Sequence, residues 1–92
     1  MGVVTRHVRV TGHVQGVFYR VWAQGQAREL GISGWIRNCS DGSVEAHVTG
    51  EEDCVTRMIE RMQRGPANAR VDGVKVEEVA PGEDSHRFEV RH

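Results

Sequence analysis

The sequence predicts an α+β sandwich in which two helices pack on one face of a four- to five-stranded antiparallel sheet. Several segments alternate apolar and polar residues, the pattern of strands with one buried face. Two other segments carry apolar residues at helical spacing. The length of 92 residues is typical of one small domain, so residues 1–92 are expected to form a single domain.

A change of period in the first third of the chain predicts a strand followed by a helix. Residues 4–12 alternate, and the apolar residues of one parity are Val4, Val8 and Val10. From about residue 20 to residue 30 the spacing is helical, with a stripe of Ala23, Ala27 and Leu30. Gly31, directly after the stripe, is suited to a C-terminal cap. Gly25 inside this helix is unfavourable, because glycine in a helix interior costs about 1 kcal/mol relative to alanine. Nothing in the sequence explains its presence there.

A hairpin is expected over residues 32–49. Asp41-Gly42 is a strong turn signal, which places the turn at residues 39–43. The return strand alternates, with inward residues Val44, Ala46 and Val48 and outward residues Glu45, His47 and Thr49.

The second helix is indicated by its stripe and by both of its ends. The stripe consists of Val55, Met58, Ile59 and Met62. Thr49 and Glu52 have the spacing of a capping box, and Gly65-Pro66 ends the helix.

Two further strands are expected near residues 71–79 and 86–91, separated by a turn at Pro81-Gly82. The resulting order, β-α-β-β-α-β with a short final strand, is the ferredoxin-like arrangement. Many functions share this architecture, so function has to be argued from a site.

Charge and composition exclude several classes of protein. The chain has 12 basic and 13 acidic residues and a net charge of −1, so a broad basic surface for nucleic acid is not expected. No apolar run approaches the roughly 20 residues of a membrane helix, and the first residues show no targeting signal, so a cytoplasmic protein is expected. Cys39 and Cys54 are expected to be partly buried free thiols, with one disulfide as the alternative.

The segment between the first strand and the first helix carries the strongest chemical signal. Residues 12–20 form a glycine-bearing turn that leads into a helix N-terminus, an arrangement that binds anions. Gly12 and Gly16 allow a tight backbone path. The positive charge of Arg20 at a helix N-terminus is unfavourable unless a bound anion neutralises both this charge and the positive end of the helix dipole. The Arg20 guanidinium can donate paired hydrogen bonds to phosphate oxygens. The alternative is that Arg20 points into solvent or pairs with a glutamate.

A second candidate is Asn38, where the first hairpin strand enters its turn. Its amide has donors and an acceptor and can hold a water molecule. The alternative is that Asn38 caps the turn, a common role of asparagine.

Together the two segments resemble the signatures of the acylphosphatase family. The pattern Gly-x-Val-Gln-Gly-Val-x-(aromatic)-Arg is present as residues 12–20. The pattern Gly-(aromatic)-(Val or similar)-x-Asn-x-x-Asp-Gly-x-Val-Glu is present as residues 34–45. The resemblance extends over nearly the whole chain, and its departures are small. Ile36 replaces a commoner valine, Tyr19 stands where phenylalanine is frequent, and His92 stands where many relatives have an aromatic residue.

This resemblance implies hydrolysis of acyl phosphates to a carboxylate and inorganic phosphate. Arg20 matches the arginine that binds the phosphoryl group, and Asn38 matches the asparagine that orients the attacking water. The loop backbone would add N–H donors, so the implied phosphate-binding residues are Val14, Gln15, Gly16, Val17, Phe18, Tyr19 and Arg20. No metal or cofactor is implied, because positioning and charge stabilisation carry phosphoryl transfer. The implied protein is a monomer acting on a small-molecule acyl phosphate, with no nucleic acid or membrane partner.

Other functions of the same architecture remain as alternatives. An RNA-binding module would stack bases on aromatic residues of its central strands, but residues 44–48 contain no Phe, Trp or Tyr. A metal carrier would need paired cysteines in the first loop, which are absent. A domain that binds phosphate or a carbamoyl group without turnover is the third alternative, and the presence of both Arg20 and Asn38 argues against it. The scattered histidines, and the place of Cys39 in a hairpin turn, argue against a covalent nucleophile.

Overall fold

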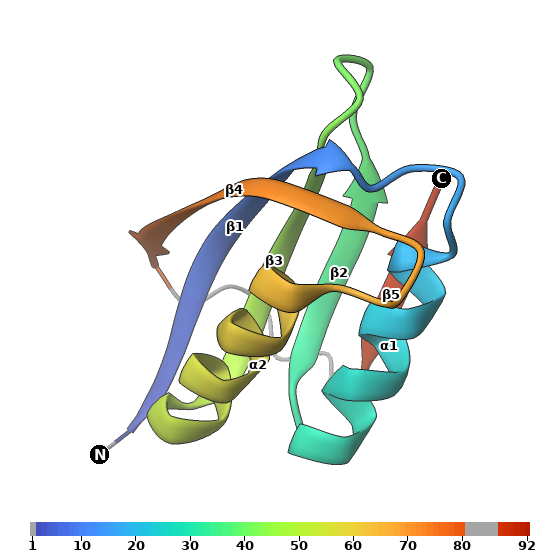
Figure 1. Cartoon of the computed structure of the whole chain (residues 1–92). Helices are drawn as coiled ribbons and strands as arrows, with labels where there is room; N and C mark the ends of the chain where they lie inside the picture. The colour runs from blue at the N-terminus through green and yellow to red at the C-terminus, as the bar shows by residue number, and fades with distance from the viewer. Residues whose placement is uncertain (1, 81–86) are drawn as a thin grey trace.

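Two helices cover one face of a five-stranded sheet in the computed structural model, which describes residues 2–80 and 87–92 (Figure 1). The elements in chain order are β1 (Val3–His13), α1 (Tyr19–Leu30), β2 (Ser33–Asn38), β3 (Val44–Glu51), α2 (Glu52–Arg64), β4 (Arg70–Val79) and β5 (Phe88–Arg91). The expected ferredoxin-like arrangement with a short final strand is confirmed.

The strand order is β4-β1-β3-β2-β5, and the expectation of a purely antiparallel sheet is wrong. The pairs β1–β4, β1–β3 and β2–β3 are antiparallel, but β5 pairs with β2 in parallel, with Gly34 opposite Phe88. β4 runs antiparallel to β1 and ends at the end of the sheet where β1 and β2 begin. β5 lies at the far edge of the sheet, starts at this same end and runs in the same direction as β2.

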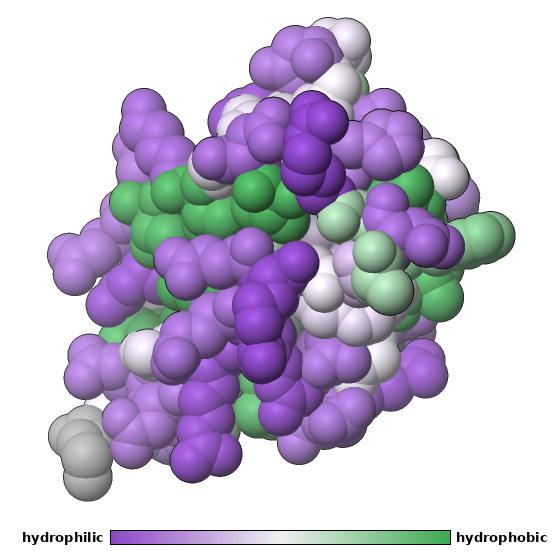
Figure 2. Space-filling view, viewed as in Figure 1, coloured by the Kyte–Doolittle hydropathy of each residue, from purple (hydrophilic) through white to green (hydrophobic). Residues whose placement is uncertain are grey.

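The core lies between the helices and the sheet. The alternation correctly predicts five fully buried residues of β1 and β3, namely Val8, Val10, Val44, Ala46 and Val48. Val4, near the start of β1, is only partly buried. The helical stripes supply Ala23, Ala27, Val55, Met58 and Met62. Leu30 and Ile59 are only partly buried and pack against this core. Figure 2 shows a hydrophobic strip along the β4 edge of this face and a second hydrophobic area at the opposite edge.

No helix of the described residues covers the opposite face of the sheet, which carries polar, charged and aromatic side chains. The Trp35 ring stacks on His47 at 4.7 Å, and the Arg91 guanidinium lies 4.9 Å from the Trp35 ring centre. Glu45 lies on this face as predicted, but it is only 5% exposed. Its burial was not expected from the alternation, and it arises because long side chains of neighbouring strands fold over the carboxylate.

Three expectations at element boundaries have different outcomes. The capping box of α2 is wrong, because the N-cap residue is Glu51 and no side chain caps the helix. Thr49 is still part of β3, where its hydroxyl lies 2.9 Å from the Thr5 hydroxyl. The predicted turn at Pro81-Gly82 lies outside the described residues, as does the expected start of the last strand at residue 86.

Two sequence expectations concern the thiols and the membrane. Cys39 and Cys54 are both free and half-buried. In the part of the chain that the structure describes, no helix is long and apolar enough to cross a membrane.

Candidate active site

The loop between β1 and α1 is anchored in the core at both of its ends. Val14 is 1% exposed and so is Tyr19, the first residue of α1. The Tyr19 hydroxyl donates a 2.6 Å hydrogen bond to the carbonyl of Met62 in the last turn of α2. Burial raises the pKa of Tyr19, so this hydroxyl keeps its proton and remains a donor. The exposed part of the loop is therefore held between two fixed points.

The sign of the backbone angle φ changes along this loop. Between residues 14 and 20, Gly16 (φ 75°) and Phe18 (φ 61°) have positive φ, and the residues beside them do not. In proteins, successive residues of opposite backbone handedness can turn their N–H groups toward one side, a geometry that binds anions. Phe18 is the one non-glycine residue with positive φ in the described chain, and its side chain is 81% exposed. This conformation costs about 1–2 kcal/mol, so the loop geometry is held by its surroundings.

Gly12 has a different role from the one expected of it. It lies within β1 at a register shift between β1 and β4, not in the cradle. A Cβ atom there would clash with the carbonyl oxygen of Arg70. Gly12 therefore permits the close approach of β4, while Gly16 permits the turn of the loop.

The N-terminus of α1 is positively charged and has no compensating carboxylate of its own. Phe18 is its N-cap without a side-chain hydrogen bond, and no acidic residue stands in the first turn. Arg20 adds a full positive charge there. Its Nη1 donates to the carbonyl of Arg91 at 2.6 Å and lies 3.4 Å from Nδ1 of His92. In the described residues Arg20 thus contacts the end of β5 and makes no ion pair with a glutamate.

Asn38 is the last residue of β2, and its side-chain oxygen is unusual. Among the described residues, Asn38 Oδ1 is the one buried side-chain oxygen or nitrogen atom without a hydrogen-bond partner. The turn that follows is held by other groups, since Asp41 Oδ1 accepts bonds from the backbone N–H and the hydroxyl of Ser43. The hydrogen bond from the Ser43 side chain is the main reason why the pKa of Asp41 is lowered. The turn therefore does not use the Asn38 side chain as its cap.

The loop, Arg20 and Asn38 meet at one end of the sheet. Nε2 of Gln15 donates to the carbonyls of Cys39 and Ser43, at 2.8 Å each, and so joins the loop to the hairpin. Arg91, which Arg20 contacts, is the β-sheet partner of Arg37, the residue before Asn38. Figure 1 shows the loop between β1 and α1 beside the end of β5.

On the face of the sheet opposite the helices, the Glu45 carboxylate contacts three basic side chains. His7 Nε2 lies 2.8 Å and Arg9 Nη2 lies 3.4 Å from Glu45 Oε2, and Arg37 also bonds the carboxylate. The pKa of Glu45 is lowered, first by the hydrogen bond from His7, so the carboxylate stays ionised. Arg37 and Arg9 are thus engaged by Glu45, whereas Arg20 contacts the carbonyl of Arg91 beside the loop.

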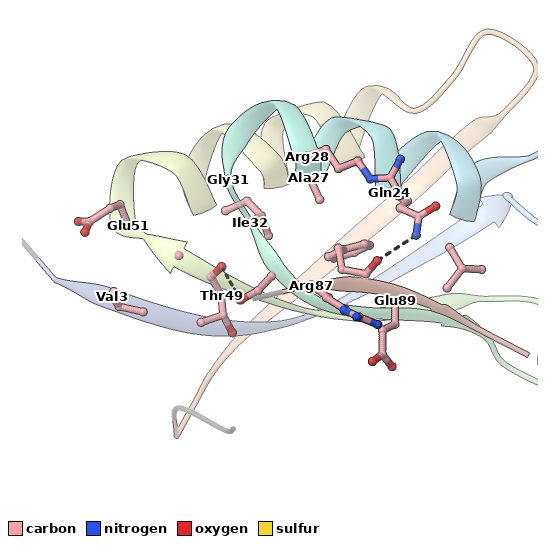
Figure 3. A pocket seen from close by; sticks show the side chains of 14 residues that line it. Val3, Gln24, Ala27, Arg28, Gly31, Ile32, Thr49, Glu51, Arg87 and Glu89 are labelled. Atoms are coloured by element: carbon pink, nitrogen blue, oxygen red, sulfur yellow. Dashed lines mark hydrogen bonds between the residues drawn. The ribbon is translucent and has the colours of Figure 1, made fainter. Parts of the chain in front are cut away.

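A larger hollow than the one beside Asn38 lies elsewhere. It has a volume of about 1200 Å³ and lies between α1 and β5, where Gln24 and Phe88 are joined by a hydrogen bond (Figure 3). A smaller hollow of about 360 Å³ adjoins Asn38, Arg37 and Glu45. The volume of a hollow does not identify the site here, because a small anion can be held by backbone N–H groups of a shallow loop and needs no deep cavity. In the described residues no cluster of three His, Cys, Asp or Glu side chains is arranged to hold a metal ion.

Comparison with known proteins decides the family. The family model described as Acylphosphatase matches residues 6–90. The chain belongs to the acylphosphatase family. The enzyme class and the family expected from the two sequence motifs are thereby confirmed.

Individual relatives agree with this assignment over nearly their whole length. An acylphosphatase of Alcanivorax borkumensis is 48% identical over 91 residues, which cover 96% of this chain and 99% of the relative. A solved acylphosphatase structure from Coxiella burnetii is 39% identical, with a TM-score of 0.92 and coverage of 97% of this chain and 93% of that one. The Bacillus subtilis acylphosphatase structure also has a TM-score of 0.92, with 30% identity and coverage of 99% and 100%.

The structure adds contacts that the sequence did not reveal. The Gln15 side chain bonds the hairpin, whereas the sequence pointed only to its backbone N–H. The contact of Arg20 with the carbonyl of Arg91 joins residues 71 positions apart, for which no local pattern exists. The periodicity of apolar residues cannot predict these hydrogen bonds, because they depend on the order of the strands in the sheet.

Proposed function

We propose that this chain hydrolyses the carboxyl–phosphate bond of acyl phosphates and releases a carboxylate and inorganic phosphate. In this proposal the backbone N–H groups of residues 14–20 and the guanidinium of Arg20 hold the phosphoryl group. Asn38 orients the attacking water. Family membership and the meeting of the loop, Arg20 and Asn38 at one end of the sheet support it.

The unpaired oxygen of Asn38 is the observation that carries this assignment of roles. A buried polar atom without a partner in the protein costs about 1–3 kcal/mol, so this oxygen needs a donor from outside the chain, such as a water molecule. A water molecule donating one proton to Oδ1 of Asn38 would satisfy the atom. The same bond would fix the direction of the water's lone pair, which the reaction needs.

The loop and Arg20 fit the other reactant, the phosphoryl group. Its oxygens carry negative charge, and the α1 N-terminus and the alternating loop backbone supply N–H donors for them. Arg20 adds a forked, positively charged donor. Its bond to the carbonyl of Arg91 restrains the guanidinium before substrate arrives.

The proposed reaction needs no side chain that acts as a general acid or a general base. The water oxygen forms a bond to phosphorus, and the bond between phosphorus and the acyl oxygen breaks. The carboxylate leaves with the electron pair of that bond and needs no proton, because it is a weak base. The proton of the water passes to an oxygen of the phosphoryl group. Enzymes of phosphoryl transfer act mainly by positioning and charge stabilisation, so the proposed chemistry uses no metal or cofactor.

The remaining parts of the proposal concern the state of the protein. The substrate is a small molecule, and we propose a cytoplasmic monomer in which residues 1–92 act as one domain. Light scattering of the purified chain at working concentration tests the monomer.

The proposal is tested by measuring the hydrolysis of benzoyl phosphate, which is monitored through the ultraviolet absorbance of this substrate. The chain should hydrolyse it equally well with and without excess chelator. Asn38→Ala should lower kcat by about a hundredfold, a loss typical of a removed positioning or polar catalytic group, and leave KM near its original value.

Asn68→Ala is the matched control, because Asn68 is exposed in the connection between α2 and β4. It should behave as the unaltered chain does. An inactive parent chain would refute the function, and full activity of Asn38→Ala would refute the role of Asn38. Loss of activity with chelator would refute metal independence alone.

A further inference from the structure

We propose that Gln15 is a positioning residue that sets the distance between the phosphate loop and the Asn38 water site. This inference rests on the proposed function and deepens it. Gln15 is the one residue of 14–18 with a polar side chain. That side chain leaves the loop and bonds the carbonyls of Cys39 and Ser43, both at 2.8 Å.

The chemistry of the two partners fixes the orientation of the Gln15 amide. Both partners are backbone carbonyl oxygens, which only accept hydrogen bonds, so the NH₂ group must face them. Both of its hydrogens are used. A glutamate at position 15 would have a similar shape but would direct a carboxylate oxygen at two carbonyl oxygens.

The two carbonyls belong to the residues that close the turn after Asn38. The Cys39 N–H donates to the carbonyl of Ser43 at 2.8 Å, and the Gly42 N–H donates to the carbonyl of Cys39 at 3.2 Å. Cys39 directly follows Asn38, and Gly16 of the cradle directly follows Gln15. One side chain therefore ties the two halves of the candidate site together, within one residue of each half.

This arrangement predicts an effect on the rate more than on binding. The proposed contacts to phosphate come from the loop backbone and Arg20, and they remain when the Gln15 side chain is removed. The position of Asn38 relative to phosphorus is then no longer held. Reaction rates depend steeply on such distances, since a displacement of about 1 Å can cost about a hundredfold.

Gln15→Met, which keeps the length and removes the donors, tests the inference with benzoyl phosphate as substrate. We expect kcat to fall by about a hundredfold while the inhibition constant of inorganic phosphate stays close to its original value. Gln24→Met is the matched control. The Gln24 amide also bonds a backbone carbonyl, that of Phe88 at 3.0 Å, but between α1 and β5 at the hollow of Figure 3. It should retain kcat.

An NMR titration with inorganic phosphate provides a readout that does not depend on turnover. In the unaltered chain, phosphate should shift the Gly16 backbone N–H and the Asn38 side-chain NH₂ together. In Gln15→Met the Gly16 shift should persist and the Asn38 shift should shrink. If the chain proves inactive but this coupling is seen, the proposed function fails and the positioning role stands.

Three results would overturn the inference. They are an unchanged Asn38 shift in Gln15→Met, a kcat no lower than that of Gln24→Met, and an inhibition constant that rises as much as kcat falls. The last would make Gln15 a phosphate-binding side chain instead.

Gln15→Glu tests the same point at constant volume, should Gln15→Met fail to fold. Near neutral pH its carboxylate would repel the two carbonyls and kcat should be low. Protonation in acid restores one O–H donor, so kcat relative to the unaltered chain should rise as the pH falls. A ratio that does not change with pH would contradict the role of the donors.

Discussion

The two helices begin very differently, although both pack on the same face of the sheet. α2 has Glu52 and Asp53 in its first turn and Arg61 and Arg64 in its last turn, so its charges match its dipole at both ends. α1 has no acidic residue in its first turn, and Arg20 stands there instead.

This difference separates stability from function within one small fold. The N-terminus of α2 is neutralised by the chain itself, which leaves little attraction for an external anion. The N-terminus of α1 keeps its positive potential and faces the loop at Gly16 and Phe18. Physical chemistry alone therefore distinguishes the two helix ends, and it selects the one that the family motif contains.

Removal of the charge at the start of α1 should have the largest effect. We expect Arg20→Ala to lower kcat/KM by about a thousandfold, the scale on which arginines act in phosphoryl transfer. Inorganic phosphate should also lose its power to raise the melting temperature, since that rise reflects binding to the folded state. Steady-state kinetics and calorimetry measure both.

Arg28→Ala is the matched control, because Arg28 lies in the last turn of the same helix. Its activity and its response to phosphate should remain. Equal losses in the two variants would show that the start of α1 is not special.

Tyr19→Phe should cause the next largest change, in stability. It removes the hydroxyl that bonds the carbonyl of Met62, and so leaves an acceptor at the end of α2 unpaired. The expected loss is about 1–3 kcal/mol in the free energy of unfolding, measured by urea denaturation. A loss too small to measure would mean that the start of α1 is not held by the end of α2.

Gly25→Ala should raise the free energy of unfolding by about 1 kcal/mol through helix propensity. A Cβ atom at Gly25 meets nothing within 4 Å, and the residue is remote from the loop, so kcat should not change. Gly16→Ala is the matched comparison, because its Cβ also has open space but its φ is 75°. That variant should lose stability instead. Equal effects of the two substitutions would contradict the strained conformation of the loop.

Asp53→Asn should have the smallest effect. It removes a charge that favours the N-terminus of α2 and should cost about 0.3–1 kcal/mol at low ionic strength, less in high salt. Glu60→Gln serves as control, since Glu60 is also exposed on α2 but lies outside the first turn. If both cost the same in thermal denaturation, the comparison of the two helix ends loses its electrostatic basis.

Much of the fold could be predicted from periodicity, but features set by distant strands could not. The alternation of β1 and the stripe of α2 are local and correctly identified buried residues such as Val8 and Met58. The direction of β5 depends on where β4 ends, and the burial of Glu45 depends on side chains of other strands. The spacing of Thr49 and Glu52 predicted a capping box, yet pairing with β1 keeps Thr49 in the sheet.

For the candidate site, the motifs predicted which residues matter but not how they are held. Arg20 and Asn38 were expected from the resemblance and the helix-start argument, and the structure brings both to one end of the sheet. The bonds of Gln15 and the unpaired oxygen of Asn38 depend on tertiary packing. No spacing rule in the sequence encodes them.

The position of β1 between β3 and β4 has a kinetic consequence. β1 pairs with segments remote along the chain, such as Thr5 with Thr49 on one side and with Val79 on the other. Chains dominated by such distant pairings have high contact order and fold slowly, because long loops must close before any pairing energy is gained. The loop and Asn38 come together only when these central strands have paired. Recovery of hydrolysis after dilution from denaturant should therefore follow the last step of refolding, later than the formation of the helices.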